Sequence, residues 1–210
     1  MVRRQLENKI VDKVATYIDS GFNDRIHILG KRIRMWQSKE LHKLLPEVPL
    51  QPDIDILWKS TDKSKPEIGG VEVKIITANS KDSLSLPYYR GIDETLALLR
   101  FGLDRVLLFE LFLISLDSEE VTNAVIQKYF PYQEATVNLL KTLRLPIGYR
   151  AAFDFVINDQ ISEDRIKVID TEDNQLRIDP PLNPYLKSND KREVGIIREY
   201  LLQRFRQRVL

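Results

Sequence analysis

Four charged side chains stand in two segments of the chain in which apolar and polar residues alternate. They are Asp53 and Asp55 in the first segment, and Glu72 and Lys74 in the second. Side chains of a β-strand point alternately to its two faces, so each segment would carry its charged pair on one face and apolar residues on the other. Paired carboxylates on a rigid element suit Mg²⁺ or Mn²⁺, and a nearby lysine can orient or deprotonate water and offset charge on a phosphate. Hydrolysis of a phosphodiester bond is the reaction that needs this set.

The composition restricts the chemistry that the chain can perform. Its 210 residues include 32 Lys and Arg against 31 Asp and Glu, two His and no Cys. The lack of cysteine excludes disulfides, thiolate zinc sites, iron–sulfur clusters and a cysteine nucleophile. Carboxylates, lysine, hydroxyls and bound metal must therefore carry any catalysis. A formal net charge of +1 gives no overall attraction to nucleic acid, so such a partner would have to be met by a local patch.

The spacing of apolar residues predicts a chain that alternates helices and strands. The strongest helical pattern lies in 3–19, and 106–114 is mostly apolar, as is typical of a strand buried on both faces. A hairpin is expected over 53–60 and 68–77, and Pro131 is expected to separate two helices. The further elements are strands within 25–36, 148–158, 164–170 and 175–179, and helices over 88–101, 118–130, 133–144 and 191–210.

This order of elements predicts an α/β protein with a central mixed sheet flanked by helices. Residues 1–180 are expected to form one domain, elaborated toward its C-terminal end by strands and a helix. Residues 181–210 would follow as a Pro-containing crossing loop and a basic amphipathic helix packed on the same domain.

The pattern Pro52-Asp53 followed by Glu72-Val73-Lys74 resembles that of the PD-(D/E)xK nucleases, which have the restriction-endonuclease-like fold. The predicted order of helix, strand, motif-bearing strand pair, helix and buried strand is similar to the core of that family, over the first half of the chain. The resemblance implies a Mg²⁺- or Mn²⁺-dependent nuclease that cleaves DNA and leaves a 5′-phosphate. Asp53, Glu72 and the backbone carbonyl of Val73 would then be metal ligands, and Lys74 the catalytic lysine.

Glu7 and Asp55 extend this candidate site. Glu7 precedes Ile10 and Val11 by three and four residues, so it lies at or near the buried face of the first predicted helix. A carboxylate there needs a cation or hydrogen-bond donors, and the resemblance implies a further metal ligand, although a helix-end glutamate that reaches water is the alternative. Asp55 shares the strand face of Asp53, where it would support or replace that ligand or simply face solvent.

Tyr89 and Arg90 stand at the start of the helix predicted after the motif. Members of the family often place a Gln and a Tyr on this helix, facing the site, and Arg90 departs from that pattern. Two alternatives remain open for Arg90. It would bind a phosphate through two guanidinium nitrogens, or pair with Glu94 four residues later on the same helix.

The predicted C-terminal helix is basic. The last 20 residues contain six Lys or Arg and two Glu, and the apolar residues among them keep helical spacing. Arg198, Arg204 and Arg208 are therefore candidates for contacts with a nucleic-acid backbone. A helix with a basic outer rim, packed on the domain, would explain the same pattern without a functional role.

Two other interpretations compete with a nuclease. One is a non-catalytic nucleic-acid-binding or assembly module on the same fold, with an idle acidic site. The other is an unrelated α/β protein with a coincidental motif, in which the charged residues form a solvated strand face with a Glu–Lys pair.

Expected partners and location follow from the nuclease interpretation and from simple exclusions. DNA is the expected partner, and a homodimer is plausible because two-fold symmetry is the simplest way to cut both strands of a duplex. Gly69-Gly70 lacks the helix start and the Lys-Ser/Thr of a P-loop, so no nucleotide cofactor is expected. No apolar run approaches the roughly 20 residues that cross a bilayer, and no signal-peptide core opens the chain. A cytoplasmic protein with no membrane partner is therefore expected.

Overall fold

In the computed structural model of the chain, the backbone is described for residues 2–21, 25–34, 53–62, 64, 66–78, 89–115, 119–157, 160–161, 167–168, 178–187 and 199–204. The elements within these residues are α1 (Val2–Gly21), β1 (Ile26–Ile33), β2 (Ile54–Ser60), β3 (Ile68–Ala78), α3 (Ile92–Arg100), β4 (Arg105–Ser115), α4 (Glu119–Thr142), β5 (Gly148–Ile157), β6 (Gln160–Ile161), β7 (Lys167–Val168) and the 3₁₀ helix η2 (Pro184–Lys187). A further helical segment covers residues 199–204.

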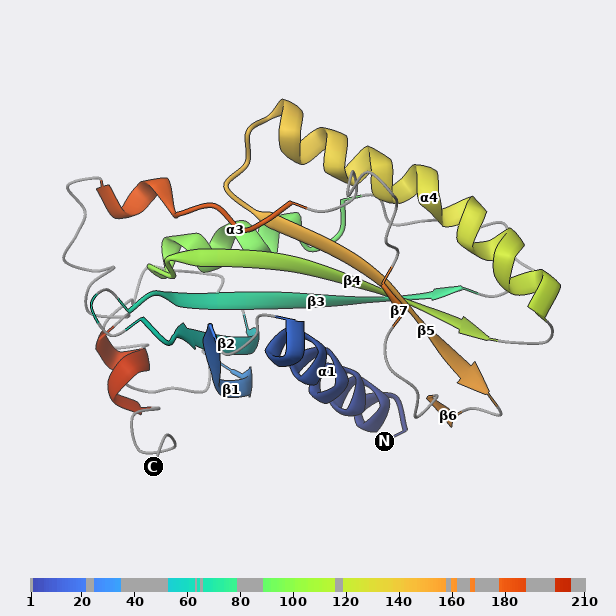
Figure 1. Ribbon diagram of the computed structural model, residues 1–210, viewed down its shortest axis with the longest axis horizontal. Coiled ribbons are helices and arrows are strands. Elements are labelled where there is room, and N and C mark those ends of the chain that lie inside the picture. Colours follow the sequence, from blue (N-terminus) through green and yellow to red (C-terminus); the bar gives the residue numbers. More distant parts are fainter. Residues whose placement is uncertain are drawn as a thin grey trace.

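A mixed sheet forms the centre of the fold (Figure 1). Within the described residues it has seven strands in the order β1-β2-β3-β4-β5-β6, with β7 also paired to β5. The pairs β1–β2 and β2–β3 are antiparallel, whereas β3–β4 and β4–β5 are parallel. Parallel neighbours need a crossover connection, and α3 and α4 lie in the two crossovers of this sheet. The predicted α/β class with a central mixed sheet is confirmed.

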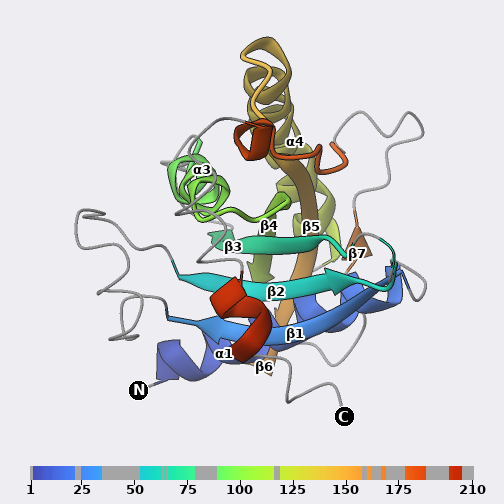
Figure 2. The same cartoon turned by 90° about the vertical axis from the view of Figure 1, so that its left-hand side faces the viewer.

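Helices cover both faces of the sheet. Helix α1 lies on one face, and α3 and α4 lie on the other (Figures 1 and 2). The strand β4 is buried on both faces, as its apolar sequence predicts: Phe109 packs in the cluster under α1, and Phe112 packs in the cluster under α3 and α4. The first helix is also tied to β5, because Lys13 forms an ion pair of 2.7 Å with the buried Asp154 of that strand.

Helix α4 continues through Pro131, so the prediction of two helices separated by this residue is wrong. A proline inside a helix lacks the N–H that would bond to the carbonyl four residues earlier, and it costs about 3 kcal/mol. Aromatic packing on both sides of the proline offsets that cost, because Tyr129 and Tyr132 are buried and their ring centroids lie 4.9 and 6.0 Å from that of Phe112. Among the described residues, no helix is both long and apolar enough to span a membrane.

Other predicted elements differ from the structure in length. The helix expected over 88–101 begins at Ile92, after a turn at Tyr89–Gly91, and the predicted stop at Gly102 is confirmed by its φ of 81°. The strand expected over 164–170 is described only as β7. In the segment 175–179, the described residue Ile178 forms an isolated bridge to Tyr149. Of the helix expected over 191–210, the described part is residues 199–204.

A buried carboxyl group lies under α4. The side chain of Glu110 on β4 has no exposed surface and accepts hydrogen bonds from the hydroxyls of Tyr132 at 3.2 Å and Tyr149 at 2.5 Å. Burial raises the pKa of Glu110 to about 7, although the two tyrosine hydrogen bonds oppose the rise. Gln133, on the same helix, is fully buried, and its amide atoms have no hydrogen-bond partner within the described structure.

The raised pKa of Glu110 predicts a specific pH dependence of stability. Because the folded protein holds this proton more tightly than the unfolded chain, the Glu110 contribution to stability is lost as the pH rises from about 4.5 to about 7. Relative to wild type, Glu110→Gln should gain about 2–3 kcal/mol of unfolding free energy between about pH 5 and pH 8. Denaturant unfolding at both pH values measures this, with Glu134→Gln, on an exposed residue of α4, as the control. A stability difference that does not change with pH would contradict the buried, proton-binding role of Glu110.

Candidate functional site

The sheet opens into a fork between β2 and β3. The last backbone pair of these two strands is Ile56 with Val71, although β2 begins at Ile54 and β3 runs on to Ala78. Beyond this pair β2 stays with β1, through Ile33 and Ile54, while β3 stays with β4. The residues of the predicted motif therefore lie where two halves of the sheet separate.

The side chain of Asp55 lies in the fork between β2 and β3. Its Oδ2 accepts a hydrogen bond of 2.7 Å from the backbone N–H of Val73, in the place where an antiparallel ladder would supply a backbone carbonyl. The β2–β3 register, continued by one pair, sets Asp55 opposite Glu72, and the two carboxylates are close enough to repel one another. The structure thus brings Asp55, more than Asp53, beside the glutamate of the motif.

Glu72 and Lys74 form the buried part of the site, and α3 adds a third charge. Glu72 and Lys74 are 5% and 9% exposed, on the face of β3 opposite Val73. The Lys74 Nζ lies 2.7 Å from Glu72 Oε1 and 2.6 Å from Glu94 Oε2. Glu94 projects from the first turn of α3, and it also shares a hydrogen bond with Glu72. One ammonium group is therefore shared by two carboxylates from different elements.

The pKa values of this cluster reflect burial and mutual repulsion. Burial raises the pKa of Asp55 to about 6, against the lowering effect of the Val73 hydrogen bond. Burial, followed by the charge of Asp55, raises the pKa of Glu72 to about 9. Burial alone would lower the pKa of Lys74, but Glu72 and Glu94 outweigh it and raise this pKa. Burial alone would raise the pKa of Glu94, but the hydrogen bonds of Glu94 to Glu72 and Lys74 outweigh it and lower this pKa. The cluster thus binds protons that a second cation would displace.

A pocket of about 160 Å³ opens beside Asp55. Glu7, Asn8 and Val11 of α1 form one wall, and the others come from the ends of β1 and β2, with Arg32, Arg34, Asp53 and Asp55. Arg32 has a φ of 54°, which is strained for a non-glycine residue, and its guanidinium donates to the carbonyl of Asn8 and to Asp12 at 2.9 and 3.0 Å. These bonds hold the end of β1 against α1, so the pocket combines carboxylates with two guanidinium groups.

The donor set fits a hard divalent cation. Among the described residues, no three His, Asp or Glu side chains converge as a metal cluster. A pair of carboxylates with a backbone carbonyl is a smaller set. Asp55, which lines the pocket, and Glu72, whose charge interacts with that of Asp55, supply such a pair. Burial raises the pKa of both carboxyls, and the charge of Asp55 raises that of Glu72 further. A bound Mg²⁺ or Mn²⁺ would relieve this condition.

The predicted site residues do not all reach this cluster. Asp53 and Glu7 are exposed and line the pocket on its outer side. Arg90 is exposed and lies close enough to Glu94 to lower the pKa of that carboxyl, in agreement with the pairing alternative. Tyr89 is 43% exposed, with a φ of 63°.

Of the three arginines expected to contact a nucleic-acid backbone, Arg204 lies within the described residues. Arg204 is exposed and donates to the hydroxyl of Tyr200 at 2.6 Å, with its guanidinium 5.8 Å from the centre of that ring. Arg198 and Arg208 lie outside the described residues.

Two residues of the site were missed in the sequence. The sequence indicates Glu94 only as a partner of Arg90 along the helix, whereas the structure places it on Lys74. Arg34 follows β1 and received no role, although the antiparallel pairing of β1 with β2 places it near the start of β2. In both cases the signal would have been a charged residue at the end of an element that packs against the motif hairpin.

Comparisons with known proteins add little to this description. No family model matches the chain, and no curated protein matches it. A solved structure, that of Pyrococcus furiosus SfsA in complex with Ca²⁺, aligns with a TM-score of 0.37 and 15% sequence identity. The alignment covers 80% of this chain and 63% of that one, so the chain spans less than two thirds of the length of SfsA. The function proposed below therefore rests on the geometry of the chain itself.

The buried charge of Asp55 predicts that this residue destabilises the metal-free protein. Asp55→Asn keeps an oxygen for the Val73 N–H but removes the buried charge, so at about pH 7.5 it should raise the free energy of unfolding by about 1–3 kcal/mol. The gain should shrink toward about pH 4, where Asp55 is protonated in the folded state. Chemical denaturation in the presence of a chelator measures it, with the exposed Asp93→Asn as the control. Destabilisation by Asp55→Asn at neutral pH would show that this carboxylate is structural.

Proposed function

We propose that the chain is a metal-dependent nuclease with a restriction-endonuclease-like fold, which hydrolyses phosphodiester bonds in DNA. The observation that carries this proposal is the ion pair of the buried Glu72 with Lys74, next to the half-buried Asp55, at the fork between β2 and β3. Buried charges with strongly shifted pKa values are costly to the fold and are typical of functional sites. The order of helix, antiparallel strands, helix and parallel strand around the fork supports the same fold family.

Each part of the site has a role in this reaction. Asp55, Glu72 and the Val73 carbonyl would hold Mg²⁺ or Mn²⁺, with Asp53 and Glu7 facing the same pocket. The metal, when bound, supplies a Lewis acid for the scissile phosphate and for the attacking water. Lys74, as a fixed ammonium group beside Glu72, orients that water and offsets the charge that grows on the phosphate oxygens.

The arginines of the pocket suit a phosphate substrate. Arg32 and Arg34 line the pocket that contains Asp53 and Asp55. A guanidinium group binds phosphate through paired N–H donors, so the pocket offers cations for the substrate next to carboxylates for the metal. This local arrangement provides the patch that the near-neutral overall charge of the chain requires.

A second function, nucleic-acid binding without catalysis, has a specific observation in its favour. In this structure Lys74 already neutralises Glu72 and Glu94 at 2.7 and 2.6 Å, so the cluster is balanced in part without a metal. An idle site of this kind would bind DNA but not a divalent cation. Titration calorimetry with Mn²⁺ distinguishes the two functions, because the nuclease must bind the ion and Glu72→Gln must weaken that binding.

The nuclease proposal is tested by cleavage of plasmid and branched DNA in Mg²⁺ or Mn²⁺. Wild-type protein should nick or cut the DNA and leave 5′-phosphates. Lys74→Met, which keeps the buried aliphatic stem, should lower the rate by about 100-fold or more with little change in fold. Asp55→Ala and Glu72→Ala should abolish metal-dependent cleavage.

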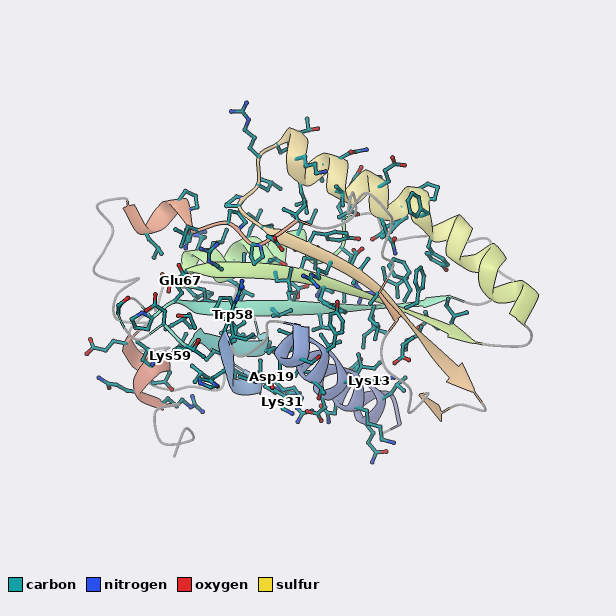
Figure 3. All side chains as sticks on the ribbon, viewed as in Figure 1. Lys13, Asp19, Lys31, Trp58, Lys59 and Glu67 are labelled. Atoms are coloured by element: carbon teal, nitrogen blue, oxygen red, sulfur yellow. The ribbon has the colours of Figure 1, made fainter. Side chains whose placement is uncertain are left out.

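A matched control comes from the same hairpin. Lys59 on β2 pairs with Ile68 at the end of the hairpin remote from the fork, next to the backbone pair of Ser60 and Glu67. Figure 3 labels Lys59 and Glu67 at this end. Lys59→Met should therefore leave cleavage within about two-fold of wild type. Cleavage that survives Lys74→Met together with Asp53→Ala and Asp55→Ala would overturn the assignment.

A further inference from the structure

We propose that the first turn of α3 positions Lys74 for catalysis: Gly91 makes room for the aliphatic stem of the lysine, and Glu94 holds its ammonium group when Glu72 engages the metal. This inference rests on the nuclease function proposed above, and it adds Glu94 and Gly91 to the site as positioning residues.

The contact between α3 and Lys74 is direct. Glu94 Oε2 accepts a hydrogen bond of 2.6 Å from Lys74 Nζ, and the two residues are 20 positions apart in the sequence. The lysine side chain is 11% exposed, whereas that of Glu94 is 49% exposed. Glu94 therefore reaches inward from the rim of the site and covers the lysine from the side of the helix.

Gly91 shapes the space beneath the helix. Its φ is +86°, and a Cβ placed on it would lie 2.6 Å from Cε and 2.8 Å from Cγ of Lys74. A side chain at this position would displace the lysine stem, and the backbone conformation itself disfavours any residue other than glycine. The glycine thus allows the first turn of α3 to rest directly on Lys74, which brings Glu94 within hydrogen-bonding distance one turn later.

The metal and the ammonium group of Lys74 compete for Glu72, and a second carboxylate on the lysine resolves this competition. A carboxylate that binds a divalent cation shares its negative charge with that cation and holds a neighbouring ammonium group less strongly. With Glu72 as its sole partner, Lys74 would lose its anchor on metal binding, at the moment when it has to be fixed beside the phosphate. Glu94 comes from a different element, α3, and besides its hydrogen bond with Glu72 it has its own contact with the ammonium group, through which it can retain the lysine.

Reductive methylation of the full-length protein, with and without Mn²⁺, tests the positioning role without relying on catalysis. Formaldehyde and a mild hydride donor methylate exposed lysine amines, and mass spectrometry of peptides gives the rate at Lys74. The rate should be low in wild type in both conditions. In Glu94→Gln it should rise about 3-fold or more without metal and further with Mn²⁺, because the charge that retains the ammonium group is lost.

The neighbouring residue Asp93 supplies the matched control. It carries the same charge on the same first turn of α3 and is exposed, so Asp93→Asn removes the helix-end charge without touching Lys74. In Asp93→Asn, the methylation rate of Lys74 should stay within about two-fold of wild type. Gly91→Ala should raise the rate in the same direction as Glu94→Gln. If circular dichroism shows that Gly91→Ala does not fold, Glu94→Gln remains informative, because Glu94 is exposed.

Kinetics separate this inference from the nuclease proposal. With Mn²⁺ and DNA, Glu94→Gln should lower kcat by about 10-fold or more, with KM and the Kd for Mn²⁺ within about two-fold of wild type. Glu94→Asp, which keeps the charge, should recover part of kcat. Unchanged methylation of Lys74 in Glu94→Gln would overturn the positioning role. A wild-type protein without nuclease activity would instead overturn the proposed function, and the methylation rates would still decide whether α3 holds the lysine.

Discussion

At Ile56 and Val71 the backbone pairing of β2 with β3 ends, and the side chain of Asp55 takes over the hydrogen bond to Val73 that the ladder would have made. This bond fixes a carboxylate at the end of the β2–β3 pairing, opposite Glu72. It also opens the pocket, because β1 and β2 move away together. The rest of the site follows from the fork: α1 borders the pocket on one side, and α3 brings Glu94 to Lys74 on the other.

The site and the core place opposite demands on the sheet. Most of β3 and β4 is apolar and buried, yet Glu72, Lys74 and Glu110 are buried in the same two strands. Glu110 is satisfied by tyrosine hydroxyls and belongs to the core. Glu72 instead lies next to another carboxylate and shares its lysine with a third. In the proposed nuclease, the difference between a satisfied and a strained buried acid would separate structural from functional charges.

The elements with clear hydropathy patterns could be predicted from the sequence, including α1, the hairpin and β4, because a single residue period, or in β4 a continuous apolar run, accounts for each. Local rules failed where tertiary packing opposes them, as at Pro131, where buried tyrosines keep the helix continuous. Alternation placed Asp53 and Asp55 on one face, but only the end of the β2–β3 pairing decides which of them meets Glu72. The contact of Glu94 with Lys74 depends on how α3 packs on β3, which no spacing in the sequence encodes.

The ion pair between Lys13 and Asp154 joins residues 141 positions apart. Contacts of such sequence separation slow folding, because a long loop must close before they form. During synthesis the first helix leaves the ribosome early but cannot make this contact until β5 has followed. Glu7 and Asn8, on that helix, therefore reach their final place beside the fork only late in the synthesis of the chain. The pocket beside the fork is therefore completed only when most of the sheet has been made.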